Sequence, residues 1–114
     1  MRQASNLYKA LSDQNRLRIL MMLREKSLCV CEIVKILQLA NSTVSKHLSI
    51  LRHADLIMNE KDGRWVNYRL TSNLESEKID SVMSQLHDFL KNDETIQHDH
   101  QLLVDVDRFQ ICGS

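Results

Sequence analysis

The sequence predicts a mainly α-helical domain with one small β-hairpin, and three observations predict it. Apolar residues recur at helical spacing in four short segments of the first fifty positions. Two β-prone runs then surround Asp62-Gly63, a dipeptide typical of a tight hairpin turn. A last apolar stripe at helical spacing follows within residues 79–90. With 114 residues the chain has room for one domain, which excludes two-domain enzymes.

The first two predicted helices lie within residues 4–23. Apolar residues recur at helical spacing in the first of them: Ala4, Leu7, Tyr8 and Leu11. Ser12 and Asp13 then offer side-chain oxygens that can cap a second helix from Asn15 to Leu23. The second helix is apolar on nearly every face, which predicts a central position in the core.

The next two predicted helices form a helix-turn-helix. An i, i+3, i+4, i+7 stripe predicts a helix around residues 30–37: Val30, Ile33, Val34 and Leu37. After a break at residues 38–41, a fourth helix turns three apolar residues inward: Val44, Leu48 and Leu51. Its outward residues are polar: Ser42, Lys46, Ser49 and His53. Two helices joined by so short a turn indicate a helix-turn-helix.

The hairpin completes the predicted fold. Along its second strand, Val66, Tyr68 and Leu70 face one side, and Trp65, Asn67 and Arg69 face the other. A helix-turn-helix followed directly by a hairpin is a winged helix, so the predicted fold class is a mainly α winged helix-turn-helix with a small β-hairpin. Any other small α+β domain with a hairpin is the alternative.

The helix predicted within residues 79–90 has a wide apolar stripe: Ile79, Val82, Met83, Leu86, Phe89 and Leu90. The stripe either packs back on its own domain or pairs with its counterpart in a second chain, as in a homodimer. We therefore predict a DNA-binding and dimerisation domain over residues 1–91. Residues 92–114 form an acidic C-terminal tail, to which the pattern assigns no secondary structure.

The charge of the chain is divided unevenly. Residues 1–70 carry twelve Lys or Arg and six Asp or Glu, whereas residues 71–114 carry three and nine. The basic part predicts an anionic partner. No apolar run reaches the roughly 20 residues that cross a bilayer, and no signal-peptide pattern is present, so we expect a cytoplasmic protein. Two glycines cannot build a phosphate loop, and no acid–base pair stands at a suggestive spacing, so we expect no enzyme.

The predicted DNA-binding residues start the fourth helix and flank the hairpin turn. A helix N-terminus favours phosphate oxygens, and a major groove about 12 Å wide admits one helix. The candidates are Asn41, Ser42, Thr43, Ser45, Lys46 and His47, with Lys61 and Arg64 at the turn.

These candidates also have structural alternatives. Asn41 and Ser42 can cap the helix, and His47 lies about 60° from the core stripe, which favours packing beside the core. Lys61 and Arg64 either grip phosphates or belong to a solvated turn.

Cys29 and Cys31 stand just before or within the first turn of the third helix. In an intact helix these thiols would lie about 200° apart, so one ion could bind both only if the helix start unwound. Unwinding there would disturb the helix that braces the DNA-binding helix, which links ligand binding to DNA release. Thiolates select soft ions rather than Mg²⁺ or Ca²⁺, and buried inert cysteines are the alternative.

Three segments, SLCVCEI, STVSKHLSILRHADLI and KDGRWVNYRL, resemble the ArsR/SmtB family of winged-helix repressors, most of all its arsenical-resistance operon repressors. The resemblance covers roughly residues 4–70. It implies a homodimer joined through the first and last helices, binding to double-stranded operator DNA in the apo state, and release when As(III) or Sb(III) binds cysteine thiolates. Such sensors typically read CVCDLC, and this chain has Val34 in place of the third cysteine.

The sequence therefore leaves open which group would supply a third ligand. Cys112 could supply it, from the same chain or across a dimer, or solvent or a small thiol could complete a site on Cys29 and Cys31. His98-Asp99-His100 resembles a transition-metal ligand set, but the family pattern is not reproduced and we predict a solvated tail.

These observations predict a metalloid-responsive repressor without an organic cofactor. Its predicted metal-binding residues are Cys29, Cys31 and Cys112. The alternatives are a thiol redox-sensing repressor and a Cd²⁺, Pb²⁺ or Zn²⁺ sensor of the same family.

Overall fold

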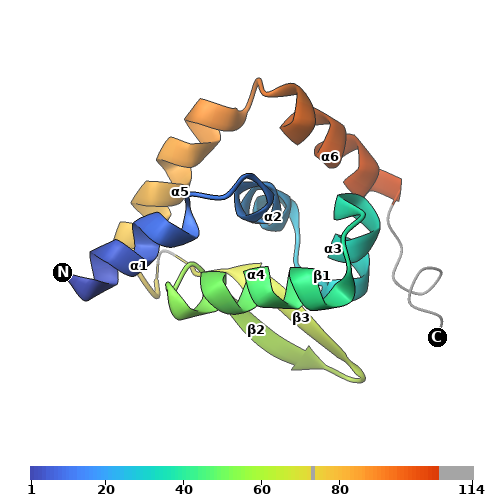
Figure 1. The fold of residues 1–114 in the computed structure, drawn as a ribbon, viewed down its shortest axis with the longest axis horizontal. Helices are drawn as coiled ribbons and strands as arrows, with labels where there is room; N and C mark the ends of the chain where they lie inside the picture. Colours follow the sequence, from blue (N-terminus) through green and yellow to red (C-terminus); the bar gives the residue numbers. More distant parts are fainter. Residues whose placement is uncertain (73, 106–114) are drawn as a thin grey trace.

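The structure, a computed structural model, describes residues 1–72 and 74–105 and has the predicted winged-helix architecture. The elements are α1 (Arg2–Ala10), α2 (Gln14–Glu25), β1 (Leu28–Cys29), α3 (Val30–Leu37), α4 (Asn41–His53), β2 (Ile57–Asp62), β3 (Trp65–Leu70), α5 (Glu77–Leu90) and α6 (Glu94–Asp105). Helix α2 lies at the centre, the other helices surround it, and the β2–β3 hairpin extends to one side of the helical part (Figure 1).

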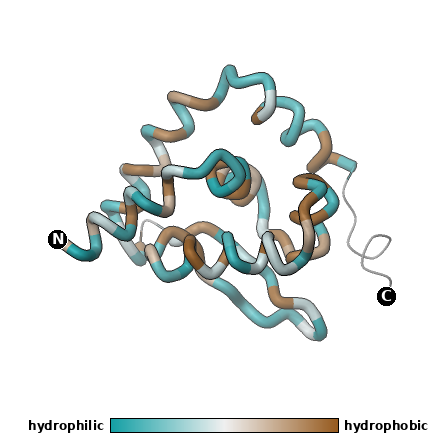
Figure 2. Tube along the Cα trace, viewed as in Figure 1, coloured by the Kyte–Doolittle hydropathy of each residue, from teal (hydrophilic) through white to brown (hydrophobic). Residues whose placement is uncertain are grey.

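Helix α2 is the core helix that the sequence predicts. Asp13 caps it, since its carboxylate accepts a hydrogen bond from Arg16 N at 3.0 Å. Residues 19–23 are all buried, which requires apolar side chains around the whole circumference. Figure 2 shows this hydrophobic centre, with the hydrophilic stretches on the outer helices.

The helix-turn-helix is also as predicted. Helix α3 ends at Gln38, whose φ of 58° puts it in the left-handed conformation that terminates many helices. Helix α4 begins three residues later and turns Val44, Leu48 and Leu51 into the core, each fully buried. Helix α3 packs against α4 and so fixes its position.

The sheet has three strands in the order β1-β3-β2, all antiparallel. The hairpin turns at Gly63, whose φ of 60° favours glycine, and its register pairs Ile57 with Leu70 and Asp62 with Trp65. Strand β1 pairs Cys29 with Asn67. The sequence did not indicate β1, because two residues are too short for an alternating pattern.

Helix α5 uses only part of its apolar stripe within the chain. Ile79 and Met83 are buried, whereas the Phe89 side chain stays 85% exposed. Tyr8 on α1 is 68% exposed. An apolar stripe left partly open on α5 is what a helix shared between two chains requires.

Helix α6 lies in the segment to which the sequence assigned no structure. Asp93 accepts hydrogen bonds from Thr95 N and Ile96 N at its start, and the helix packs against α2 and α3. Leu103 is buried in the core. The prediction of a solvated tail is wrong at Asp99, which is 2% exposed because it pairs with Arg18 of α2.

The predicted division at residues 91 and 92 falls in the turn between α5 and α6 and stays a prediction. Cys112 lies outside the described residues. Across residues 1–72 and 74–105, no helix is long and apolar enough to cross a membrane.

Candidate functional site: a DNA-binding face and a cysteine junction

The first turn of α4 is an exposed polar surface. Its N-cap is Ala40, without a side-chain capping bond, so Asn41 and Ser42 do not serve as the cap that was the alternative for them. Five of the predicted DNA-binding side chains are exposed here: Asn41, Ser42, Thr43, Ser45 and Lys46. The structure thus brings these residues together at one helix N-terminus, where backbone N–H groups and the helix dipole favour an anion.

Arg16 is a residue of this face that the sequence did not indicate. Its Nε donates to the Ala10 carbonyl at 2.8 Å and its Nη2 to the Lys9 carbonyl at 3.2 Å, which satisfies the C-terminal end of α1. Its Nη1 lies 3.1 Å from His47 Nδ1 on α4. Arg16 therefore ties α1 to α4. Its contact with His47 spans 31 positions of sequence, and no local pattern reports such a contact.

His47 is half-buried beside the core, as its helical position predicted. Together with Arg16 and Lys46 it borders an open hollow on the α4 surface. Because the Arg16 guanidinium can only donate, His47 Nδ1 is the acceptor in this contact. A direct contact of His47 with DNA stays a prediction.

Replacing Arg16 by Gln is expected to lower DNA affinity about tenfold, because a charge-assisted hydrogen bond contributes about 1.5–3 kcal/mol. The measurement is fluorescence anisotropy with a palindromic DNA fragment selected from a random pool. Arg2→Gln, which removes the same charge from an exposed position of α1, is the control and should bind like wild type. If Arg16 positions α4, the salt dependence stays unchanged, whereas loss of a phosphate contact lowers the slope by about one. An Arg16→Gln protein with wild-type affinity would contradict the prediction.

The tip of the hairpin carries the remaining predicted DNA-binding residues. Arg64 lies in the turn and Lys61 near the end of β2, and both are exposed. The Arg64 guanidinium lies 4.4 Å from the centre of the Trp65 ring, a cation–π distance that limits the orientations of this side chain. The turn lies far along the sequence from the start of α4, yet the β2–β3 hairpin, the wing of the fold, packs against α4. Phosphate contact by Lys61 and Arg64 stays a prediction.

Arg69 fastens the wing to the segment that leads into α5. Its Nη1 and Nη2 donate to the two carboxylate oxygens of Glu75 at 2.8 and 3.1 Å, and its Nε donates to Glu60 at 2.5 Å. Glu75 also accepts from Ser72 N at 2.8 Å. The bond from Arg69, and then that from Ser72 N, lower the pKa of Glu75 to about 2. The wing and the start of α5 are thus held by one guanidinium.

In an NMR titration of side-chain carboxyls, Glu75 is expected to titrate near pH 2, and Arg69→Gln should return its pKa toward 4.5. A pKa that is lower in the folded state stabilises the fold above the unfolded pKa. This contribution is therefore lost as the pH falls from about 4.5 to about 2. Equal titration of Glu75 in both proteins would show that the clamp does not form in solution.

The two described cysteines lie where strand β1 becomes helix α3. Cys29 is the last residue of β1 and the N-cap of α3, and it is 2% exposed. It forms a capping box with Glu32, whose Oε1 accepts from Cys29 N at 2.9 Å. Cys31 follows in the first helical turn and is half-buried. This confirms the predicted position just before or within that turn.

The local backbone separates the roles of the two thiols. Cys29 has an extended conformation, with φ −90° and ψ 169°, whereas Cys31 belongs to the helix. Both are thiols rather than halves of a disulfide. Within residues 1–72 and 74–105 there is no group of three or more His, Cys, Asp or Glu side chains that could hold a metal ion. Because Cys29 stands outside the helix, the separation of about 200° expected in an intact helix does not apply to this pair. Opening of the start of α3 on ion binding stays a prediction.

The sequence of this chain is similar to those of known regulatory proteins. Residues 13–58 match the family described as "Bacterial regulatory protein, arsR family". The arsenical resistance operon repressor of Escherichia coli is 39% identical over 69 residues, which are 60% of this chain and 59% of that protein. The repressor of the same name from Bacillus subtilis is 35% identical over 86 residues, 75% of this chain and 78% of that protein. The cadmium resistance regulatory protein CadC of Listeria innocua is 40% identical over 65 residues, 56% of this chain and 55% of that protein.

Solved structures agree with the fold. HlyU from Vibrio cholerae has a TM-score of 0.69 and 32% identity, and the match covers 80% of this chain and 95% of HlyU. The homodimeric winged helix-turn-helix DNA-binding domain Mb0332 from Mycobacterium bovis has a TM-score of 0.69 and 22% identity over 82% of both chains. From the matched motif, the well-covered relatives and the shared architecture, the chain belongs to the ArsR family of helix-turn-helix transcriptional regulators.

Proposed function

We propose that the chain is a homodimeric repressor that binds double-stranded operator DNA without inducer and leaves it when As(III) or Sb(III) binds cysteine thiolates. Family membership supports the regulatory role, and two relatives are arsenical resistance operon repressors. The observation that carries the inducer assignment is the pair of thiols at the junction of β1 and α3. The matched segment spans only 59% of the Escherichia coli relative. The inducer and the DNA contacts are therefore proposed from the side chains of this chain.

DNA binding is proposed for the exposed first turn of α4 and the hairpin tip. In the major groove, hydroxyl and amide groups of this turn can read base edges, and Lys46 can reach a phosphate. Lys61 and Arg64 would hold the neighbouring backbone. Phosphate contacts of this kind predict affinity that falls steeply with added salt.

Dimerisation is proposed through α1 and α5. Each presents a large exposed ring, Tyr8 on α1 and Phe89 on α5, and Val82 and Leu86 of α5 are half-buried. A second copy would cover these side chains, and an interface of two identical surfaces gives the two-fold symmetry of a palindromic operator. The similarly folded Mb0332 domain is described as homodimeric.

The coupling between inducer and DNA is proposed to run through the start of α3. Capture of an ion by the thiolates of Cys29 and Cys31 would withdraw Cys29 from its capping box and open the first turn of α3. Because α3 packs against α4, the DNA-binding helix would lose part of its brace. Soft thiophilic ions are the ligands that this donor pair prefers.

Cys112 is proposed as a third ligand. Lys26 Nζ donates to the Leu103 carbonyl at 3.2 Å, which holds the end of α6 beside the chain that leads into Cys29. Cys112 itself lies outside the described residues, so this ligand is proposed from the sequence.

A second candidate is a sensor of a soft divalent cation. A cadmium resistance regulator is among the relatives, and thiolates also bind soft divalent cations. Oxidation of the two thiols is the other alternative, since a redox change at the cap of α3 would act on the same helix.

The deciding experiment titrates the reduced protein, bound to a fluorescent palindromic fragment, with arsenite, antimonite, Cd²⁺, Zn²⁺ and peroxide in parallel. Release by arsenite or antimonite at the lowest concentration is expected. Release by Cd²⁺ or by peroxide alone would replace the metalloid assignment with the corresponding alternative. A protein that binds no DNA fragment before any addition would overturn the repressor itself.

A further inference from the structure

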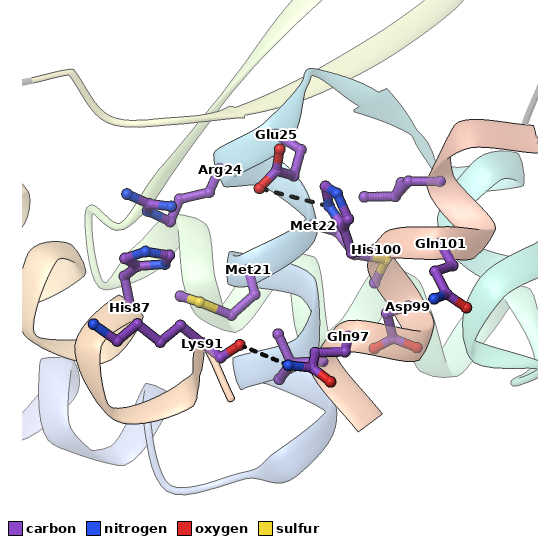
Figure 3. Close-up of a pocket in the computed structure, with 12 residues that line it drawn as sticks. Met21, Met22, Arg24, Glu25, His87, Lys91, Gln97, Asp99, His100 and Gln101 are labelled. Carbon is purple, nitrogen blue, oxygen red and sulfur yellow. Dashed lines mark hydrogen bonds and ion pairs between the residues drawn. The ribbon is translucent and has the colours of Figure 1, made fainter. Parts of the chain in front are cut away.

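A second candidate site lies away from the DNA-binding face, in a pocket of about 350 Å³ between α2, α5 and α6 (Figure 3). Its floor is apolar: Met21, Met22 and Leu103 are buried, and Ile96 is half-buried. The volume falls in the range of roughly 300–1,000 Å³ that small-molecule sites occupy. The proposed repressor function assigns this pocket no role.

One wall of the pocket is basic. Figure 3 shows Arg24 of α2 beside His87 and Lys91 of α5. In the described part of the chain, Arg24 and His87 side chains have no hydrogen-bond or ion-pair partner. The Lys91 ammonium has one weak contact, 3.9 Å from Asp88, whose side chain is 76% exposed. Two permanent cations thus border the apolar floor without a strong counter-ion.

Neither acidic group of the pocket pairs with the basic wall. The Asp99 carboxylate binds Arg18 through two hydrogen bonds of 2.8 and 2.9 Å. The Glu25 carboxylate lies on the side of the pocket away from Lys91, with one weak contact of 3.7 Å to His100 Nδ1 (Figure 3). Within the described residues, neither acid forms an ion pair with Arg24 or Lys91.

Helix-end electrostatics explain only part of this arrangement. Arg24 and Lys91 each lie at the C-terminal end of a helix, where a cation complements the helix dipole. That effect needs one cation on each helix and places no requirement on the space between them. Here the two helix ends converge over an open apolar floor, which is the arrangement of an amphipathic ligand site.

We infer that this pocket binds a small monocarboxylate with an apolar body of about the size of one aromatic ring. The carboxylate lies between Arg24 and Lys91, where charge-assisted hydrogen bonds favour it. The apolar body rests on the thioethers of Met21 and Met22, which make favourable contacts with rings. His87 adds a ring nitrogen that donates or accepts according to its tautomer.

The test is calorimetric titration of the reduced, inducer-free full chain with phenylacetate and with its neutral isostere phenylacetamide. Saturable binding of one phenylacetate per chain is expected, with phenylacetamide at least tenfold weaker. The double variant Arg24→Gln/Lys91→Gln should weaken phenylacetate at least tenfold. Arg2→Gln/Lys35→Gln, which removes the same charge from exposed positions outside the pocket, should bind like wild type.

Three outcomes would overturn the inference: no saturable binding of phenylacetate by wild type, equal affinity for the amide, or the same loss in both double variants. Circular dichroism confirms that each variant is folded. Cys29→Ser should leave phenylacetate binding unchanged, so the result is independent of the proposed metalloid site. Failure of this titration would likewise leave DNA binding and its release by arsenite intact.

Discussion

Cys29→Ser and Cys31→Ser proteins are each expected to stay on operator DNA at arsenite concentrations that release the wild type. One thiolate in place of two cannot open the start of α3, because a single sulfur can bind the ion without leaving its backbone position. By linkage, arsenite must bind the DNA-free protein more tightly than the DNA-bound one, and a preference of about 100-fold corresponds to about 2.7 kcal/mol. Arsenite titrations of the free and DNA-bound protein, read by calorimetry and anisotropy, measure this difference.

A further variant adds a sulfur instead of removing one. Val34→Cys gives the spacing of three thiols that typical arsenical sensors have, and release should then require less arsenite than in wild type. Cys112→Ser tests whether Cys112 is the third ligand, because this change weakens arsenite binding only if Cys112 binds the ion. Normal release by both the Cys29→Ser and the Cys31→Ser protein would show that the inducer binds elsewhere.

Asp99→Ala is expected to lower the free energy of unfolding by about 3 kcal/mol, measured by urea denaturation followed by circular dichroism. Breaking a buried ion pair costs roughly 3–5 kcal/mol when the remaining charge stays buried. The Arg18 side chain is 22% exposed and can regain some water, which favours the lower end of this range. The hydrogen bonds that Arg18 donates to Asp99 raise the pKa of Arg18. Helix α6 should lose protection from hydrogen exchange before the core helices do.

Asp88→Ala provides the control for that stability change. Asp88 is an exposed acid of α5 with one contact of 3.9 Å to Lys91, and such surface pairs contribute roughly 0–1 kcal/mol. Its removal should leave the urea midpoint nearly unchanged. Equal losses in the two variants would mean that the Arg18–Asp99 pair does not fasten α6.

The parts of the fold that sequence reasoning could predict are those that repeat a pattern along the chain. The stripe from Val30 to Leu37 matches the bounds of α3, and Asp62-Gly63 marks the turn of the hairpin. The turn dipeptide does not give the register, because Asp62 pairs with Trp65 and the two residues between the strands are Gly63 and Arg64. Of the two capping candidates, Asp13 caps α2, whereas the Ser12 hydroxyl donates to the Lys9 carbonyl. These elements rely on contacts between neighbours in sequence, which the sequence alone displays.

The features that could not be predicted depend on single contacts between distant positions. Helix α6 is held in place partly by the ion pair between Asp99 and Arg18, which lies 81 positions earlier in the sequence. Because Asp99 is charged, hydropathy alone predicts that it is solvated. Arg16 meets His47 across 31 positions in the same way. The exposed polar turn of α4 was predictable as a candidate for DNA contact, whereas the arginine that holds it was not.

Cys29 belongs to a sheet and to a helix at once, and this has a mechanical consequence. Its backbone pairs with Asn67 on the wing strand β3, while its position caps the helix that supports α4. If Cys29 leaves this position when it binds an ion, as proposed, the pairing with β3 and the start of α3 would be disturbed together. In the proposed mechanism no signal has to cross a distance, because the ligand-binding residue joins the wing strand to the helix that supports α4.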